Sequence, residues 1–206
     1  MKAIIHRSAC WAMMLWLMVG GCVSLEKSYP DKRYFVLEVD HRGNSGAPKK
    51  GVVLLVSSLR VSPRYDGRSF IYRLSDANFE SDFYNQFLVS PGALITEEVR
   101  RAVSQAGITE HVVGTASQLE STHVLEGTVD ALYGDFRDRS APRAVLEMEF
   151  FLSKDSATKA EIIARRRYHK SVIVNGGSAE ALVGGWNVAL NEILTALAAD
   201  LRAVNF

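Results

Sequence analysis

The sequence contains little cysteine, and this scarcity limits its chemistry. Only two of its 206 residues are cysteines, Cys10 and Cys22, and both lie near the start of the chain. The residues beyond them therefore have no disulfide framework, no thiolate metal site and no catalytic thiol. Stability has to come from a packed core, for which the length and the 48% share of hydrophobic residues are ordinary and suit one domain.

Sequence motifs that signal catalysis are also missing. The chain has no glycine-rich phosphate loop, no nucleophile elbow and no paired-histidine zinc motif. The dense charged run 135–139 is interpreted as a solvated turn, because exposed carboxylates make poor general acids. The histidines beyond Cys22 lie far apart in the sequence, at His41, His111, His123 and His169. We therefore predict no enzyme activity, no cofactor and no metal site.

Neither sign of charge is in excess. The chain has 24 basic and 23 acidic residues; without residues 1–21, which contain Lys2 and Arg7, the count is 22 basic against 23 acidic, a net charge of −1. This balance predicts no binding of nucleic acid. The basic run 165–167 is the exception, but strand side chains alternate, so its first and third arginines share one face and Arg166 points to the other. A solvated sheet face is the favoured interpretation.

No hydrophobic run near the start of the chain is long enough to cross a bilayer. The uncharged stretch 8–21 has 14 residues and follows a short basic start at Lys2, His6 and Arg7. A transmembrane helix needs about 20 apolar residues. A basic start followed by a short apolar run is typical of a secretory signal peptide, which we expect to cover residues 1–21.

This run ends in Val19-Gly20-Gly21-Cys22, which resembles the lipobox of bacterial lipoproteins. Small residues allow a peptidase to fit the backbone closely, and the cysteine thiol accepts the acyl group. We therefore expect lipidation of Cys22 and attachment to a membrane through its acyl chains. An ordinary secretory peptide or an uncleaved anchor is the alternative. Residues 22–32 would be a tether on the order of 30 Å long if extended, and residues 33–206 a single domain.

The residue pattern beyond the tether predicts an α/β fold with a mixed β-sheet. Strands are expected at 33–39, 51–61, 69–74, 78–82, 110–113, 122–137, 143–153 and 161–174, with the third and fourth forming a hairpin. The continuous Val, Leu and Ser run at 51–61 is typical of a strand buried on both faces, so it is expected at the centre of the sheet. Alternation places one side of the seventh strand in the core: Ala144, Leu146, Met148, Phe150 and Leu152.

Two helices are expected to pack on this sheet. Ser90 is a suitable cap for the first, with Pro91 in its first turn and apolar residues at three- and four-residue spacing after it. Ser178 opens the second, whose apolar stripe consists of Leu182, Trp186, Leu190, Ile193, Leu197 and Leu201. A sheet with helices packed on its faces accounts for these elements.

The last two strands are expected to form an antiparallel hairpin whose turn is centred near Ala157. Glu147 would then face Arg167, and Glu149 would face Arg165, on the side of the sheet away from the core. Opposite charges across strands favour this pairing and would help to set its register.

Several segments occur in an order and spacing that point to one family. They are 33–37 (Arg-Tyr-Phe-Val-Leu), 70–73 (Phe-Ile-Tyr-Arg), 84–91, 125–127 with 132–136, and the final Leu-rich helix. Through them, most of the chain from Tyr34 to Arg202 resembles the ABC-type transport auxiliary lipoproteins, the PqiC-like group. The resemblance implies a mixed sheet with helices on both faces, similar to the amino-terminal domain of TolB.

The same resemblance implies a role beside an MCE-type system, in which an inner-membrane ABC transporter and a periplasm-spanning MCE protein move phospholipid between membranes. It implies an MCE-domain partner and allows a ring of several copies, without catalytic residues. Val23 and Ser24 follow the cysteine, and the absence of Asp there resembles lipoproteins held on the periplasmic face of the outer membrane.

Two other functional classes stay open. One is a structural or activating lipoprotein of another envelope machine, such as a synthase activator or an export component. The other is a hydrolase or small-ligand carrier, which a large dry pocket or a buried acid-base pair would favour.

Aromatic residues in the predicted hairpin and the loop after it suggest a partner-binding surface. Phe70, Tyr72, Tyr84 and Phe87 are the candidates, because aromatic residues are common at the centres of interfaces. Packing of these side chains in the core under the first helix is the alternative.

Overall fold

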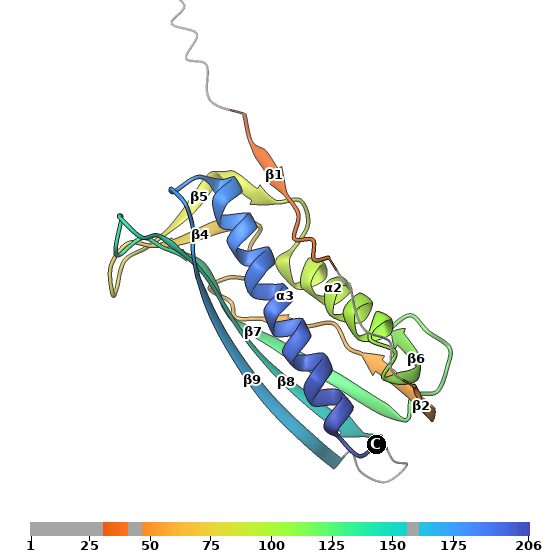
Figure 1. Cartoon of the computed structure of the whole chain (residues 1–206). Helices are drawn as coiled ribbons and strands as arrows, with labels where there is room; N and C mark the ends of the chain where they lie inside the picture. The colour runs from red at the N-terminus through yellow and green to blue at the C-terminus, as the bar shows by residue number, and fades with distance from the viewer. Residues whose placement is uncertain (1–30, 41–46, 156–160) are drawn as a thin grey trace, which may run out of the picture. The chain divides into compact units, whose positions relative to one another are not determined.

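A long strand, β7 (His123–Asp135), forms the middle of the sheet. The computed structural model describes residues 31–40, 47–155 and 161–206, and within these residues nine strands make one sheet. On one side β7 pairs antiparallel with β8 (Arg143–Lys154), which pairs antiparallel with β9 (Glu161–Ile173). Figure 1 shows these three strands as the long curved part of the sheet.

Three shorter strands follow one another along the other side of β7, and all run parallel to it. They are β2 (Lys49–Val56), β3 (Arg60–Val61) and β4 (Ser69–Arg73). The outer strands are β6 (Thr109–Gly114) beside β2, β5 (Phe79–Phe87) beside β4, and β1 (Arg33–Phe35) beside β5. The mixed α/β sheet expected from the sequence, including its β4–β5 hairpin, is therefore confirmed.

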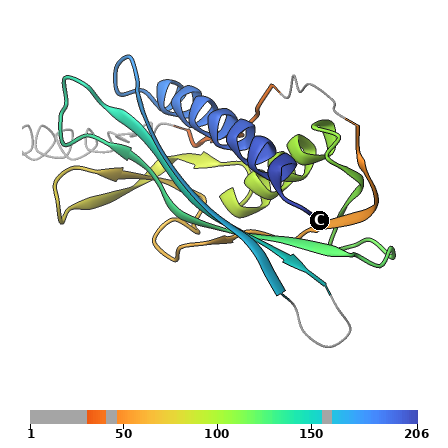
Figure 2. The same cartoon turned by 60° about the horizontal axis from the view of Figure 1, so that its bottom comes forward.

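Both helices begin where the sequence predicts. α2 (Pro91–Gln105) is capped by Ser90, whose hydroxyl accepts a hydrogen bond from the Ala93 N–H, and α3 (Ala179–Ala203) is capped in the same way by Ser178. The two helices contact each other and lie on one face of the sheet (Figures 1 and 2). Helices on both faces, as the family resemblance implied, are therefore wrong for the described chain.

The reason is visible in the strands. β9 exposes alternate side chains on the face away from the helices, including Arg165 and Arg167, so that face needs no apolar cover there. Near the end of β7 the segment after β3 covers this face instead, where the Tyr65 ring stacks on Tyr133 at a centroid distance of 5.9 Å.

The core lies between the helices and the sheet. The inward face of β8 and the stripe of α3 are buried as predicted, and Trp186 of α3 is fully buried at their contact with β4 and β5. Of the described helices, α3 has the length and apolar composition to cross a membrane, but its apolar stripe forms part of this core.

Two expectations about strands are wrong. The run 51–61 divides into β2 and β3, and β2 lies beside the outer strand β6 while β7 takes the centre. β2 buries Leu54 and Val56 on the helix side but leaves Val53 and Leu55 partly exposed, because no helix covers the other face. The first strand is also shorter than 33–39: only Arg33–Phe35 pairs with β5.

The expected register of the β8–β9 hairpin is wrong by two residues. Glu149 faces Arg167 rather than Arg165, and Glu147 faces His169. An even shift keeps every side chain on its predicted face, so the apolar pattern does not distinguish the two registers. Glu149 still binds both arginines, with 2.6 Å from Arg165 Nε to its Oε1 and 3.5 Å from an Arg167 nitrogen to its Oε2.

Candidate functional site

Exposed apolar side chains gather where the described chain begins. The large hydrophobic residues exposed in the described structure number nine, and five of them lie on β1 or directly after it, at the β5 bulge, or directly after β5. We call these five the β1-edge cluster: Tyr34, Val36, Phe83, Leu88 and Val89. Contiguous exposed apolar side chains mark interaction surfaces in soluble proteins, so this cluster is the candidate site.

Alternation along β1 and the residue after it exposes two of the five cluster residues. Phe35 packs toward the core, with its ring centroid 5.3 Å from that of Phe70, while Tyr34 and Val36 point outward. The Leu88 N–H donates to the Phe35 carbonyl at 2.8 Å, which places Leu88 beside β1. The edge strand thus carries a continuous apolar ridge.

An irregularity in β5 exposes Phe83. Ser69 and Ile71 of β4 pair with Gln86 and Ser81, so β5 holds three extra residues between the two pairs. The extra segment is fixed by Asp82, whose Oδ1 accepts hydrogen bonds from the backbone N–H groups of residues 84 and 85 at 2.7 and 3.0 Å. A bulge of this kind redirects side chains, and Phe83 is consequently 63% exposed.

A chain of polar contacts holds the site together beneath the cluster. Asp82 Oδ2 accepts hydrogen bonds from the Tyr72 hydroxyl at 2.5 Å and from Asn85 Nδ2 at 2.6 Å. Arg33 donates from Nε to Asn85 Oδ1 at 3.0 Å and forms an ion pair with Glu180 at 2.6 Å. β4, β5, β1 and α3 are therefore joined through side chains as well as through the sheet.

Protonation states suit this arrangement. Burial would raise the pKa of the Asp82 carboxyl, but hydrogen bonds from Tyr72, Asn85 and two backbone N–H groups hold that pKa below its ordinary value. Burial, and then the neighbouring Asp82, raise the pKa of Tyr72 above its ordinary value. At neutral pH Tyr72 is therefore a donor and Asp82 a charged acceptor, so the network is fully formed.

Cations lie over the two exposed rings of the cluster. Lys32 Nζ is 4.2 Å from the Phe83 ring centroid, and the Arg68 guanidinium carbon is 5.3 Å from the Tyr34 ring centroid. Arg68 Nε also donates to the Phe87 carbonyl at 2.9 Å. The surface combines aromatic and aliphatic side chains with positive charge.

The structure separates the four aromatic residues predicted to bind a partner. Phe70 and Phe87 are 0% and 2% exposed and pack against Trp186, so the prediction is wrong for these two: their strands turn them toward the helices. Tyr72 and Tyr84 are half-buried beside the cluster, where the Tyr84 ring lies 5.2 Å from that of Phe83. For these two, partner contact stays a prediction.

Other predicted features fall into two groups. Cys22 and His41 lie outside the described residues. Within the described part of the chain, no three His, Cys, Asp or Glu side chains gather as metal ligands, and the charged run after β7 is held by hydrogen bonds from Arg137 to Asp135. Phe83 was missed because β5 was expected to end at residue 82.

Comparison with known proteins identifies the fold. No family model matches the sequence, and no curated protein matches it. The chain is similar to the crystal structure of protein XCC0632 from Xanthomonas campestris, of family-model DUF330, with a TM-score of 0.71, 17% identity, and coverage of 81% of this chain and 92% of that one. A crystal structure of an uncharacterized protein has a TM-score of 0.65 and 16% identity, covering 84% and 99%. The chain shares the fold of these proteins.

Proposed function

We propose that this chain is a lipoprotein of a bacterial envelope and a non-catalytic accessory component of an MCE/ABC-type lipid transport system. The observation that carries the proposal is the β1-edge cluster, an exposed apolar surface at the start of the domain. The lipobox-like segment ending at Cys22 lies ten residues before Lys32. Anchor and surface would therefore act together at one end of the chain.

The anchor would restrict where the domain works. Ten residues span at most about 35 Å, so acyl chains on Cys22 would keep the domain close to one membrane. Val23 and Ser24 favour the periplasmic face of the outer membrane. One acyl chain binds only marginally, whereas the several chains of a lipobox cysteine give stable attachment.

An accessory role requires a preorganised surface rather than reacting groups. The polar network of Tyr72, Asp82, Asn85, Arg33 and Glu180 supplies this, because it fixes the backbone under the cluster. A fixed surface loses less entropy when it binds. The partner would be an MCE-domain protein, with Tyr72 and Tyr84 nearest to the contact and with several copies of the chain able to take part.

Acylation can be tested directly. Cys22→Ala is expected to abolish palmitate labelling and to remove the protein from the outer-membrane fraction, whereas Cys10→Ala, within the signal peptide, is the matched control and should change neither. Persistent labelling and fractionation of the Cys22→Ala protein would contradict the anchor.

The partner requires a separate experiment. The acylated protein is expected to co-purify with an MCE-domain protein. Tyr84→Ala should weaken this co-purification, whereas Leu119→Ala, in the loop after the outer strand β6, should not. Recovery with a synthase or an export complex in place of an MCE protein would overturn the transport role and favour another envelope machine.

A further inference from the structure

We propose that the β1-edge cluster contacts the bilayer itself, so that the anchored domain lies on the membrane through this surface. The inference rests on the proposed lipid anchor. It assigns the exposed side chains of the cluster to a lipid surface with anionic headgroups and leaves the neighbouring Tyr72 and Tyr84 to the protein partner. Tyr34, Phe83, Leu88 and Val89 would enter the headgroup region, with Lys32 and Arg68 beside lipid phosphates.

The path of the chain places the cluster next to the anchor. Lys32 is the first residue of the compact unit, and its Nζ lies over the Phe83 ring. The tether from Cys22 therefore ends at the cluster. A linker of ten residues gives the tethered surface a high effective concentration at the bilayer. Because the tether joins the domain at the cluster, this effect favours contact of the cluster with the bilayer.

The composition of the cluster fits the interface between headgroups and acyl chains. Aromatic rings are favoured at this depth, and basic side chains beside them are attracted to anionic lipid. Arg68 lies over the exposed Tyr34 ring and Lys32 over the exposed Phe83 ring. Leu88 and Val89 add aliphatic surface.

Two acidic side chains near the cluster are held by contacts within the domain. Glu180 is paired with Arg33, and Asp82 accepts hydrogen bonds from Tyr72 and Asn85. The charge of Glu180 is therefore balanced by Arg33, whereas Asp82 keeps its negative charge because its donors are neutral. Lys32 and Arg68 face the exposed rings.

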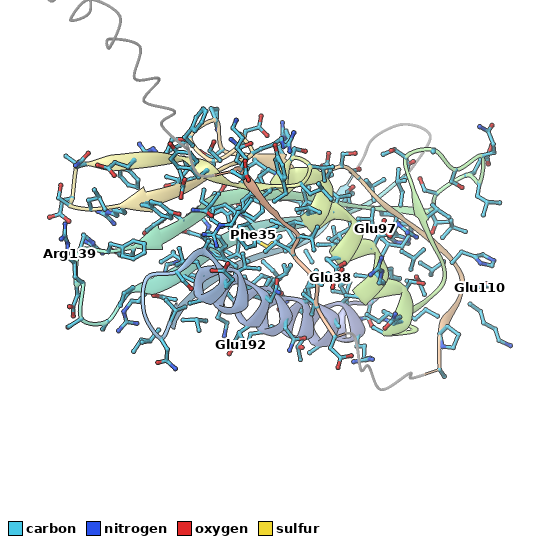
Figure 3. The ribbon with its side chains drawn as sticks, turned by 90° about the horizontal axis from the view of Figure 1, so that it is seen from above. Phe35, Glu38, Glu97, Glu110, Arg139 and Glu192 are labelled. Atoms are coloured by element: carbon cyan, nitrogen blue, oxygen red, sulfur yellow. The ribbon has the colours of Figure 1, made fainter. Side chains whose placement is uncertain are left out.

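Beyond the cluster the chain turns away from the sheet edge. The Glu38 N–H donates to Asn187 Oδ1 of α3 at 3.2 Å, and the Val39 N–H donates to Glu98 Oε2 of α2 at 3.1 Å. Figure 3 shows the segment from Phe35 to Glu38 crossing to the helix layer. The apolar ridge thus ends at Val36, so the contact surface is confined to the end of the domain where the tether joins it.

Tryptophan reporters can locate the bilayer. If residues 1–21 are removed, Trp186 is the one remaining tryptophan, and it is fully buried. The acylated protein that begins at Cys22, purified from membranes, would be placed in vesicles of phosphatidylethanolamine and phosphatidylglycerol that contain lipids brominated near the headgroup. Phe83→Trp is the probe and Leu119→Trp the control, because both positions are exposed and lie far apart in the strand order: Phe83 is in β5, beside the edge strand β1, and Leu119 is in the loop after β6, the strand at the other edge. Leu88→Trp replaces the probe if Phe83→Trp lowers the melting temperature.

The expected result is quenching at position 83 that is about twofold or more stronger than at position 119, since interfacial side chains lie near the headgroup boundary. The quenching at position 83 should decrease in vesicles of phosphatidylcholine alone and in the Lys32→Ser, Arg68→Ser double variant. Equal, weak quenching at both positions in a protein that floats with the vesicles overturns the inference and leaves the anchor intact. If instead the tryptophan at position 83 becomes shielded only when an MCE-domain protein is added, the surface belongs to that protein, and the inference is overturned. If the purified protein carries no acyl chains and does not float with the vesicles, both the lipid anchor and the bilayer contact are overturned.

Discussion

Gly185 of α3 and Ala144 of β8 approach so closely that a Cβ added to Gly185 would lie 2.6 Å from the Ala144 Cβ. It would also lie 2.5 Å from Val174 Cγ1. Overpacking of this kind costs about 1–3 kcal/mol, which exceeds the gain of about 1 kcal/mol from replacing a helical glycine by alanine. Gly185→Ala should therefore lower the free energy of unfolding measured in urea.

Gly184 provides the matched control for this prediction. It precedes Gly185 in the same helix, but an added Cβ would meet no atom within 4 Å. Gly184→Ala should raise stability by up to about 1 kcal/mol. Similar effects of the two substitutions would show that α3 is not seated on β8 as described.

Truncation of aromatic side chains should separate core from surface on β4 and β5. Phe70→Ala removes a fully buried ring that touches Phe87 and Trp186, and should destabilise the protein by about 3–5 kcal/mol. Phe83→Ala removes an exposed ring and should change stability by no more than about 0.5 kcal/mol. Chemical unfolding of the two variants checks this; a large loss for Phe83→Ala would place that ring in the core.

Asp82 should be the acidic residue on β5 that matters most for stability. Asp82→Ala leaves the Tyr72 hydroxyl, the Asn85 amide and two backbone N–H groups without their acceptor, and unpaired groups of this kind cost about 1–3 kcal/mol. Glu80→Ala, at an exposed position of the same strand, should have little effect. Equal melting temperatures for both variants would contradict the role of the network.

Acid should destabilise the protein through His123. Burial, and then the charge of Lys154, lower the pKa of this imidazole, and its Nε2 has no hydrogen-bond partner among the described residues. In the unfolded chain the pKa is about 6.5, so there the ring takes up a proton that the folded protein disfavours. The contribution of His123 to stability is thus present above about pH 6.5 and is lost as the pH falls toward the lowered folded value.

The measurement is the melting temperature between about pH 7.5 and 5.5, on either side of the unfolded pKa. His123→Gln should flatten this pH dependence, whereas His111→Gln, at an exposed position, should leave it unchanged. An unchanged slope in His123→Gln would exclude the buried imidazole as its source.

Local signals in the sequence were sufficient for much of the fold. Ser90 and Ser178 identify the helix starts because a cap is read from adjacent residues. The alternation in β8 identifies its buried face for the same reason. These features depend on residues a few positions apart, so the pattern is complete in the sequence.

Other features depend on contacts between distant segments. Phe70 and Phe83 are both aromatic, but Phe70 is buried against Trp186 of α3, whereas Phe83 is exposed by the bulge that Asp82 fixes in β5. No periodicity in the sequence indicates either contact. A glutamate in an amphipathic helix is ordinarily solvent-exposed, yet Glu98 is buried and accepts the Val39 N–H from 59 residues away. The hairpin register was missed because two registers differing by an even number satisfy the same apolar pattern.

Arg33 also has a mechanical consequence. A pulling force on the chain before Lys32 would reach the domain at the residue where one guanidinium binds β5 through Asn85 and α3 through Glu180. The load would be divided between the sheet and the long helix, and it would not act on the three-residue strand alone. When the membrane moves relative to a protein bound to the domain, the tether would then be stretched before the domain unfolds.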